Sequence, residues 1–287
     1  MPELPEVETV RRGLQPALES ARLTSVEARR PDLRFPFPER FAERLTGARV
    51  EAVERRAKYL LMPLDTGETW VTHLGMTGRF SIERRGDAEA PGRFHNAAPA
   101  EDKHAHVLLE TDGGAGVTFF DARRFGYMGL IATAELQAHP WFAGLGPEPL
   151  GPEFTAAHLL RRFAGRARAV KPLLLDQRIV AGLGNIYVSE ALHRAGIDPR
   201  AAGGSVTPVR LKRLVEAVRA VLEEAIQAGG STLRDFSNAK GELGYFQHRF
   251  RVYDRANAAC PKPRCRGVTR RIVQGGRSTF YCPVCQR

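Results

Sequence analysis

The 287-residue sequence has no run of about 18 consecutive apolar residues, so no segment is long enough to cross a membrane as a helix. Its first residues, MPELPEVETVRRGL, lack an apolar core, and we therefore expect no signal peptide. No internal repeat or low-complexity tract is visible. These absences predict a cytoplasmic protein with no membrane partner, and the length suffices for two domains with hydrophobic cores.

Acidic residues are scarce relative to basic ones, since 32 Asp and Glu oppose 43 Lys and Arg and leave a formal net charge of +11. The imbalance is strongest from Arg249 to Arg287, where ten basic residues accompany one acidic residue, Asp254. A cytoplasmic protein this basic usually has a polyanionic partner, most often nucleic acid, although a solvated basic surface would carry the same charge. Charge alone therefore favours nucleic acid only modestly.

Cysteine is absent from the first 259 residues and occurs four times in the last 28. The spacing is Cys-x4-Cys, sixteen residues, then Cys-x2-Cys. Two close pairs in a reducing compartment indicate metal binding instead of disulfides, and this spacing fits a tetrahedral zinc ribbon. Four thiolates leave no position for water, so we expect one structural Zn²⁺ per chain. The ligands are Cys260, Cys265, Cys282 and Cys285.

The chain begins with a predicted helix, in which Val7, Val10 and Leu14 recur at helical spacing and Pro5 suits the first helical position. A β-rich region follows, because seven short segments rich in β-branched and aromatic residues alternate with turns. This pattern predicts a β-sandwich or a barrel. The segments are 22–29, 48–54, 58–64, 69–74, 104–110, 117–120 and 127–133.

Residues 84–103 are polar and are expected to form a mobile loop, whereas residues 135–150 are rich in Pro and Gly and indicate a linker. The pattern then becomes helical. Pro208 opens a helix with one apolar stripe, which Gly229 and Gly230 terminate. The predicted organisation is a β-sandwich domain (1–134), a linker (135–150), a helical domain (151–248) and a zinc finger (249–287).

Two turns carry residues suited to phosphate. Asn185 lies between two helical segments, where we expect it to cap the second, and a glycine-flanked helix N-terminus lets backbone N–H groups approach a phosphate. Arg277 follows a predicted hairpin turn at 274–276 within the cysteine-rich segment. A plain helical hairpin and a solvated arginine are the alternatives.

Two further turns suggest contact with a base stack. The segment Asp121–Gly126 contains two arginines beside Phe125, which indicates a wedge between bases, although a turn with Phe125 in the core would have the same sequence. The segment His73–Gly78 is a similar turn, and its Met76 taken alone would be assigned to core packing.

The N-terminus is a candidate nucleophile. Methionine before proline is normally removed, which exposes Pro2 as a secondary amine. An α-amino group has an ordinary pKa of about 7.7–8.0, so a fair fraction is neutral at working pH. Attack of this amine on a sugar C1′ gives an iminium ion, an electron sink for β-elimination of phosphate, and Glu3 can transfer protons beside it.

Together these motifs resemble one family, the bacterial formamidopyrimidine-DNA glycosylases. The matching segments are MPELPEVETVRR (1–12), RRAKYLL (55–61), HLGMTGRF (73–80), DARRFG (121–126), LGPEPL (145–150), KPLLLDQ (171–177), GLGNIYVSEAL (182–192), GGSTLRDF (229–236) and RSTFYCPVCQ (277–286). The resemblance implies an α+β multidomain fold: an N-terminal β-sandwich with an N-terminal helix, a helix–two-turn–helix domain and a C-terminal zinc-ribbon finger. It implies a monomeric glycosylase and AP lyase of base-excision repair, acting on duplex DNA that carries 8-oxoguanine or formamidopyrimidines.

The resemblance also implies roles for individual residues. For catalysis it implies Pro2 as the Schiff-base nucleophile, Glu3 as the general acid, Lys58 in β-elimination and phosphate binding, and Arg277 in gripping the lesion phosphates and assisting δ-elimination. For DNA it implies Met76, Arg123 and Phe125 as the side chains that fill the gap left by the flipped base, with Arg123 facing the orphaned cytosine. Backbone contacts are implied for His104, Arg166, Lys171 and Asn185, and Arg234 is placed in the loop that covers the flipped base.

The sequence departs from the family at two positions: the first cysteine pair is spaced x4 where x2 is more usual, and Ala122 replaces the usual proline of the wedge loop. Two other functions stay open. One is an endonuclease VIII-like glycosylase for oxidised pyrimidines, whose start resembles PEGPEI and which lacks this wedge loop. The other is a non-enzymatic DNA-binding protein on the same fold, against which the four implied catalytic residues argue.

Overall fold

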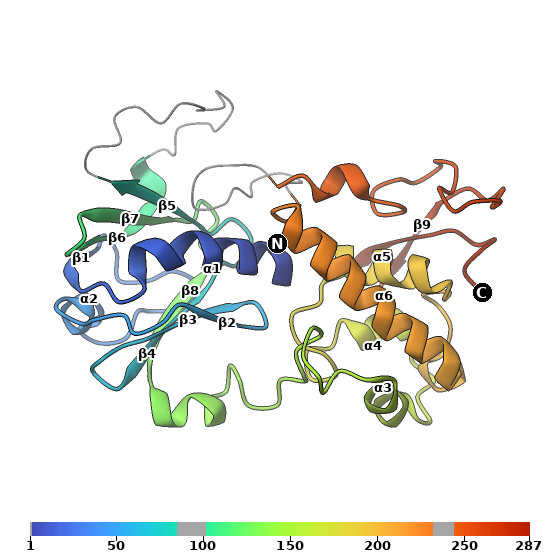
Figure 1. Cartoon of the computed structure of the whole chain (residues 1–287), viewed down its shortest axis with the longest axis horizontal. Helices are drawn as coiled ribbons and strands as arrows, with labels where there is room; N and C mark the ends of the chain where they lie inside the picture. The colour runs from blue at the N-terminus through green and yellow to red at the C-terminus, as the bar shows by residue number, and fades with distance from the viewer. Residues whose placement is uncertain (1, 85–101, 232–243) are drawn as a thin grey trace. The chain divides into compact units, whose positions relative to one another are not determined.

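The first part of the chain folds as two four-stranded antiparallel sheets with a long helix beside them (Figure 1). The computed structural model describes residues 2–84, 102–231 and 244–287. The strand orders are β1-β6-β7-β5 and β2-β3-β4-β8. The strands are β1 (Leu23–Ala28), β2 (Glu54–Arg56), β3 (Tyr59–Pro63), β4 (Glu68–His73), β5 (Arg79–Arg84), β6 (Ala105–Thr111), β7 (Ala115–Phe120) and β8 (Tyr127–Ala132).

The two sheets share one hydrophobic core. Trp70 of β4, Phe80 of β5 and Phe119 of β7 are completely buried in it, because alternate residues of each strand face the opposite sheet. Helix α1 (Leu4–Leu18) adds Val10 and Leu14 to the same core. The sheets are separate, so the predicted N-terminal β-sandwich with its helix is confirmed and a closed barrel is excluded.

Three local predictions for this region are wrong. Residues 48–54 make only isolated bridges before β2 begins at Glu54, and β5 was not predicted because three of its six residues are charged. Pro5 is the second helical residue, since α1 begins at Leu4 after its N-cap Glu3. Residues 85–101 of the predicted mobile loop lie outside the described residues.

The rest of the chain is mainly helical. Helix α6 (Pro208–Gln227) buries the predicted apolar stripe. Arg194 joins α5 (Asn185–Ala195) to it through two hydrogen bonds of 2.6 and 2.7 Å to the carboxylate of Glu224. The predicted helical segment that leads into the Asn185 turn is short, since α4 ends at Leu174. The α-helices of this region are α3 (Ala156–Phe163), α4 (Val170–Leu174), α5 (Asn185–Ala195) and α6 (Pro208–Gln227). The remaining helices of the described chain are α2 (Phe41–Leu45), η1 (Asp102–His104), η2 (Thr133–Ala138), η3 (Gly203–Ser205) and η4 (Phe246–Arg249).

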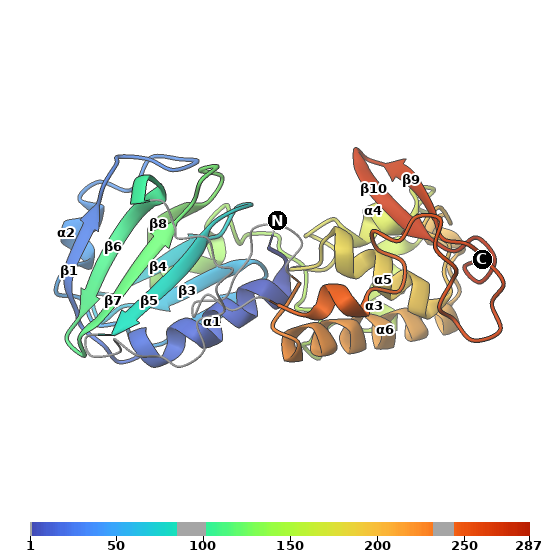
Figure 2. The same ribbon diagram turned by 90° about the horizontal axis from the view of Figure 1, so that it is seen from above.

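A two-stranded hairpin of β9 (Arg270–Gln274) and β10 (Arg277–Tyr281) lies in the C-terminal segment, drawn in red in Figure 2. Its turn consists of Gly275 and Gly276, whose φ angles of +55° and +73° are those that a tight hairpin requires and that glycine adopts without strain. The segment docks on α5 through the buried carboxylate of Glu190, which accepts the backbone N–H groups of residues 251–253 at 2.9–3.0 Å. The predicted C-terminal ribbon is confirmed.

The chain divides into two compact units, residues 1–143 with 228–245 and residues 144–227 with 246–287. Of the described residues after α6, 228–231 and 244–245 therefore belong to the sandwich unit, although residues 144–227 of the other unit precede them in sequence. The finer boundaries after residues 134, 150 and 248 stay a prediction. Within the described ranges, no helix combines the length and apolarity needed to span a membrane.

Candidate functional site

Pro2 and Glu3 are buried at the start of α1. The Glu3 carboxylate accepts the backbone N–H of Glu6, and the Glu3 N–H donates to Glu6 Oε2 at 2.8 Å, which is a capping box. Glu6 Oε1 also accepts the N–H and hydroxyl of Ser231 at 2.8 and 3.0 Å. This bracing fixes the backbone that carries the nitrogen of residue 2. Met1 lies outside the described residues.

Lys58 lies in the two-residue turn between β2 and β3, yet only 7% of it is exposed. Arg55 donates to the carbonyl of Ala57 at 3.0 Å and to Glu8 of α1 at 3.2 Å. Burial would raise the pKa of Glu8, but hydrogen bonds from two arginines of its own helix outweigh burial and hold that pKa below its ordinary value. An ionised Glu8 therefore links α1, which begins beside Pro2, to the Lys58 turn.

His73, at the end of β4, was not singled out by its sequence. Its burial, then the charges of Lys58 and Arg34, lower its pKa to about 4, so the ring is neutral at pH 7. The Gly75 N–H donates to Nδ1 at 3.0 Å, which leaves Nε2 as an N–H donor. A neutral donor beside an ammonium group suits an anion such as phosphate. The sequence did not indicate this role for His73, because a single histidine before a glycine-containing turn is a common pattern.

The wedge candidates Phe125 and Met76 are both on the surface, with 42% and 37% of their area exposed. Their turns pack closely: Gly75 has φ +62°, and a Cβ there would lie 2.2 Å from the backbone nitrogen of Gly126. The completely buried Asp121 accepts the Gly126 N–H at 2.7 Å and a hydroxyl of the Met76 turn. Phe125 is therefore not a core residue, and its insertion into DNA stays a prediction.

Arginines surround the wedge. The Arg123 guanidinium lies 4.8 Å from the centroid of the Phe125 ring, and the Arg34 N–H donates to the carbonyl of Gly126 at 3.0 Å. The carbonyl of His104 accepts the N–H of Asp121, so this predicted DNA contact adjoins the wedge loop. A surface depression beside the loop is lined by Leu33, Arg34, Arg123, Arg124 and Phe125. Arg124 belongs to the arginine pair noted in the sequence, but Arg34 was not predicted, since an isolated arginine carries no pattern.

Asn185 and Lys171, two predicted DNA contacts, hold the strand that follows Arg277. Asn185 is the first residue of α5 and not its N-cap as predicted, because Gly184 occupies the cap. Its Nδ2 donates to the carbonyl of Ser278 at 2.9 Å. Lys171 is completely buried, and its Nζ donates to the same carbonyl at 2.9 Å and to a threonine hydroxyl at 2.7 Å. A direct contact of either residue with DNA stays a prediction.

Arg277 and Arg166 present accessible guanidinium groups. Arg277 is the first residue of β10 after the two-glycine turn and is exposed, and Arg166 is exposed in the loop after α3. Exposed guanidinium groups can bind phosphate oxygens in pairs of hydrogen bonds. The predicted base-covering residue Arg234 lies outside the described residues.

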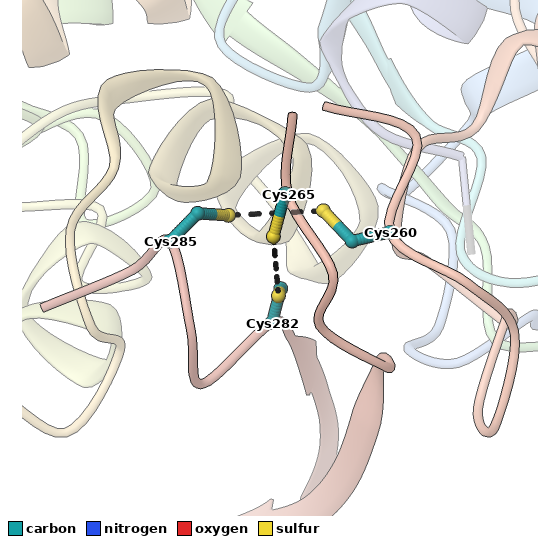
Figure 3. Close-up of side chains that lie close together, drawn as sticks. All are labelled: Cys260, Cys265, Cys282 and Cys285. Atoms are coloured by element: carbon teal, nitrogen blue, oxygen red, sulfur yellow. Dashed lines mark hydrogen bonds between the residues drawn. The ribbon is translucent and has the colours of Figure 1, made fainter. Parts of the chain in front are cut away.

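The four predicted metal ligands converge at one point, as Figure 3 shows. All four sulfur atoms lie within 4.8 Å of one another, and two pairs, Cys260–Cys285 and Cys265–Cys282, are 3.7 Å apart. Zinc–sulfur bonds of about 2.3 Å in a tetrahedron require sulfurs about 3.8 Å apart. The four residues fit zinc and form a structural zinc site, and the x4 spacing does not prevent the tetrahedral arrangement.

Three family models match the chain in order. The N-terminal domain of formamidopyrimidine-DNA glycosylase matches residues 1–128, its H2TH domain matches residues 145–237, and the zinc finger found in FPG and IleRS matches residues 263–287. Curated relatives are similar over their full length. The formamidopyrimidine-DNA glycosylases of Phenylobacterium zucineum and Caulobacter vibrioides are 61% and 60% identical to this chain, with 100% of each chain covered.

Solved structures have the same fold. A complex of the Lactococcus lactis Fpg with DNA containing an abasic site has a TM-score of 0.85 and 31% identity over 100% of both chains. The MutM (Fpg) protein from Thermus thermophilus has a TM-score of 0.83 and 39% identity, covering 99% of this chain and 98% of that one. Another Lactococcus lactis complex contains an oxidised pyrimidine in its DNA, at a TM-score of 0.84 and 31% identity over 100% of both chains.

Proposed function

This chain belongs to the formamidopyrimidine-DNA glycosylase family, and from that premise we propose which residues act and on which lesion. The protein is a DNA glycosylase of base-excision repair, in a family that has glycosylase and AP lyase activity. The proposed substrate is duplex DNA that carries an oxidised purine, 8-oxoguanine or a formamidopyrimidine. The proposed chemistry is a Schiff base on Pro2, followed by β,δ-elimination.

In the proposed reaction, the nitrogen of Pro2 attacks C1′ of the damaged nucleotide while the bond from C1′ to the base breaks. The base leaves with a proton, for which Glu3 is the general acid. The Pro2 nitrogen then loses its proton, and the C1′–O4′ bond breaks as O4′ gains a proton, which gives the iminium ion. This ion accepts the electrons released when a proton leaves C2′, and the 3′ phosphate departs. Loss of the 5′ phosphate completes δ-elimination, in which Lys58 and Arg277 are proposed to bind the leaving phosphates.

One observation carries this proposal: the capping box buries Glu3 beside residue 2 and fixes the direction of the backbone. A nucleophile loses large factors in rate when it is aimed wrongly, so a secondary amine on braced backbone suits the task. The link from Glu8 through Arg55 to the Lys58 turn supports a common site in this unit. His73 is a further residue proposed to donate a hydrogen bond to phosphate. Its ring is neutral with a hydrogen on Nε2, and it is close enough to Lys58 for the lysine charge to help lower its pKa.

DNA binding is proposed to combine a wedge with contacts to the backbone. Phe125 and Met76 would refill the stack, and Arg123 would face the orphaned base. Flipping a nucleotide out of a duplex costs a few kcal/mol, which refilling the stack offsets. Exposure of Phe125 and Met76 supports this part. The proposed backbone contacts are His104, Arg166 and Asn185, and Arg234 is proposed to cover the flipped base. Lys171, which the sequence also predicted to contact the backbone, is completely buried, and its proposed role is to hold the Ser278 carbonyl next to Arg277.

A second lesion class has support of its own, because one similar solved complex holds an oxidised pyrimidine. Cleavage rates on 8-oxoguanine and thymine glycol duplexes separate the two proposals, and faster excision of thymine glycol would reject the purine preference. We further propose a monomer that acts in the cytoplasm. Sedimentation with and without lesion DNA tests the first part.

The mechanism is tested with Pro2→Gly and Glu3→Gln on parallel 8-oxoguanine and abasic duplexes. Pro2→Gly makes the amine primary and removes the ring that fixes its direction, so excision and nicking should both fall while DNA still binds. Glu3→Gln keeps an acceptor for the Glu6 N–H but cannot donate a proton as an acid. Excision should then fail while a pre-formed abasic site is still nicked.

Borohydride trapping followed by peptide mapping identifies the nucleophile directly. Intact-mass analysis must first establish that Met1 is absent from the sample, because a retained methionine would block the amine. An adduct mapped to Lys58 or to any other lysine, with none on residue 2, would reject the proposed mechanism.

A further inference from the structure

His193, on the last turn of α5, lies against the zinc site. Its side chain is 1% exposed, and its Nε2 atom is 3.3 Å from the sulfur of Cys260. Cys260 itself is 7% exposed, so the contact is shielded from water. No role was predicted for this histidine from the sequence, because a lone histidine on a helix face is usually a core residue.

The surroundings of the other ring nitrogen, Nδ1, indicate that the Cys260 sulfur is the polar partner of this side chain. Nδ1 of His193 is buried and has no hydrogen-bond partner among the residues that the structure describes. An imidazole held for packing alone would leave both nitrogens in search of partners, at a cost for each. The orientation of the ring is instead explained by the contact of Nε2 with Cys260.

A zinc-bound sulfur needs such a donor. Four thiolates and one Zn²⁺ carry a net charge of −2, which is costly to hold in a buried site unless N–H groups share it. The Gly267 N–H already lies 3.4 Å from the sulfur of Cys265. Cys260 is the more buried of these two residues, and Nε2 of His193 lies 3.3 Å from its sulfur.

We propose that His193 is a positioning residue of the zinc site, whose Nε2–H donates a hydrogen bond to the Cys260 thiolate. A thiolate bound to zinc can only accept, so in the metal-bound protein Nε2 carries a hydrogen. Zinc is held by the four sulfurs, and His193 acts through one of them. The hydrogen bond thereby links the zinc site to α5. The first residue of that helix, Asn185, donates to the Ser278 carbonyl next to Arg277. This inference concerns the zinc site and stands apart from the proposed lesion preference.

Docking of the cysteine segment on α5 does not depend on His193 alone. The side chain of Gln286 donates to the carbonyl of Ile197 at 2.8 Å and accepts the Cys282 N–H at 2.8 Å. The Arg287 N–H donates to the carbonyl of Gly196 at 3.2 Å. A variant at position 193 should therefore keep the segment in place while it removes one donor to one sulfur.

The test compares His193→Phe, which keeps a ring without a donor, with His193→Gln, whose amide N–H can take the place of Nε2–H. Competition with a chelator measures zinc affinity in the full-length protein. His193→Phe should bind zinc about 10–100-fold more weakly, the loss typical of a group that orients a metal ligand, and His193→Gln should recover most of it. Leu192→Ala, a buried change one residue away, is the control for general loss of stability.

Cobalt substitution provides a signature that packing cannot imitate. Loss of an N–H donor raises the energy of the sulfur electrons, so the sulfur-to-cobalt charge-transfer band should move to lower energy in His193→Phe and not in Leu192→Ala. Unchanged zinc affinity together with an unchanged band in His193→Phe would overturn the proposal. Should that variant not fold, cadmium-substituted native protein decides: scalar coupling between the metal and the Nε2–H proton supports the hydrogen bond, and its absence overturns it.

Discussion

Lys171→Met separates two roles for a residue that was predicted to touch DNA and that the structure buries. Its ammonium group donates to the Ser278 carbonyl and to a threonine hydroxyl, and none of its surface is exposed. Methionine keeps the length and the volume without the charge. The Ser278 carbonyl retains the Asn185 amide, so the substitution leaves that acceptor satisfied.

The expected magnitudes differ between the two roles. Each phosphate contact contributes about 0.9 to the slope of log affinity against log salt, so one contact is worth about 3.5-fold between 50 and 200 mM salt. Because Lys171 is buried, we expect Lys171→Met to leave this slope unchanged. Its effect should fall on the strand that begins with Arg277, and a misplacement of about 1 Å can cost about a hundredfold in rate. We expect strand nicking at saturating enzyme to fall about tenfold to a hundredfold.

The assay is fluorescence anisotropy on lesion DNA over a salt series, paired with single-turnover nicking of an abasic duplex. Arg166→Met is the matched control, because Arg166 is exposed and should lose about 0.9 from the slope if it contacts phosphate. A drop of about 0.9 in the slope of Lys171→Met, with normal nicking, would refute the anchoring role and establish a direct contact.

Three further predictions concern the wedge, acid stability and the metal. Phe125→Ala should weaken binding to lesion DNA more than binding to undamaged DNA in parallel titrations, because the ring is exposed in a turn and fills a stack; an equal loss on both would contradict this. His73 has a pKa of about 4 in the folded protein and about 6.5 unfolded, so unfolding takes up a proton between these values. The contribution of this group to the free energy of unfolding is present above about pH 6.5 and should fall by up to about 3 kcal/mol as the pH drops to 4. Urea denaturation over this pH range measures the fall, which should be absent in His73→Asn. Cys282→Ser should disorder the C-terminal segment and abolish DNA binding with the β-sandwich intact by circular dichroism; full lesion binding by metal-free protein would contradict this.

The sequence determined the metal site and most of the fold. Four cysteines at ribbon spacing admit few arrangements, since zinc demands four sulfurs about 3.8 Å apart, and the structure has them together. Helix α6 could be predicted from the sequence, because its apolar stripe, the proline at its start and the glycines after its end are local signals. The wedge turn was recognised from its composition, but whether Phe125 is exposed is decided by how the two turns pack at Gly75.

Other features depend on partners far away in the chain, which no local pattern contains. Residues 48–54 have strand-like composition, yet their neighbours offer only isolated bridges, while β5 pairs with β7 despite its charged residues. Lys171 was predicted to contact the DNA backbone, but its ammonium group is buried and donates to the carbonyl of Ser278, 107 residues later. His193 acquires its role only where α5 meets Cys260. Local sequence determines which elements form and which metal binds, whereas burial and hydrogen-bond partners, and with them the role of each polar side chain, exist only once distant segments pack together.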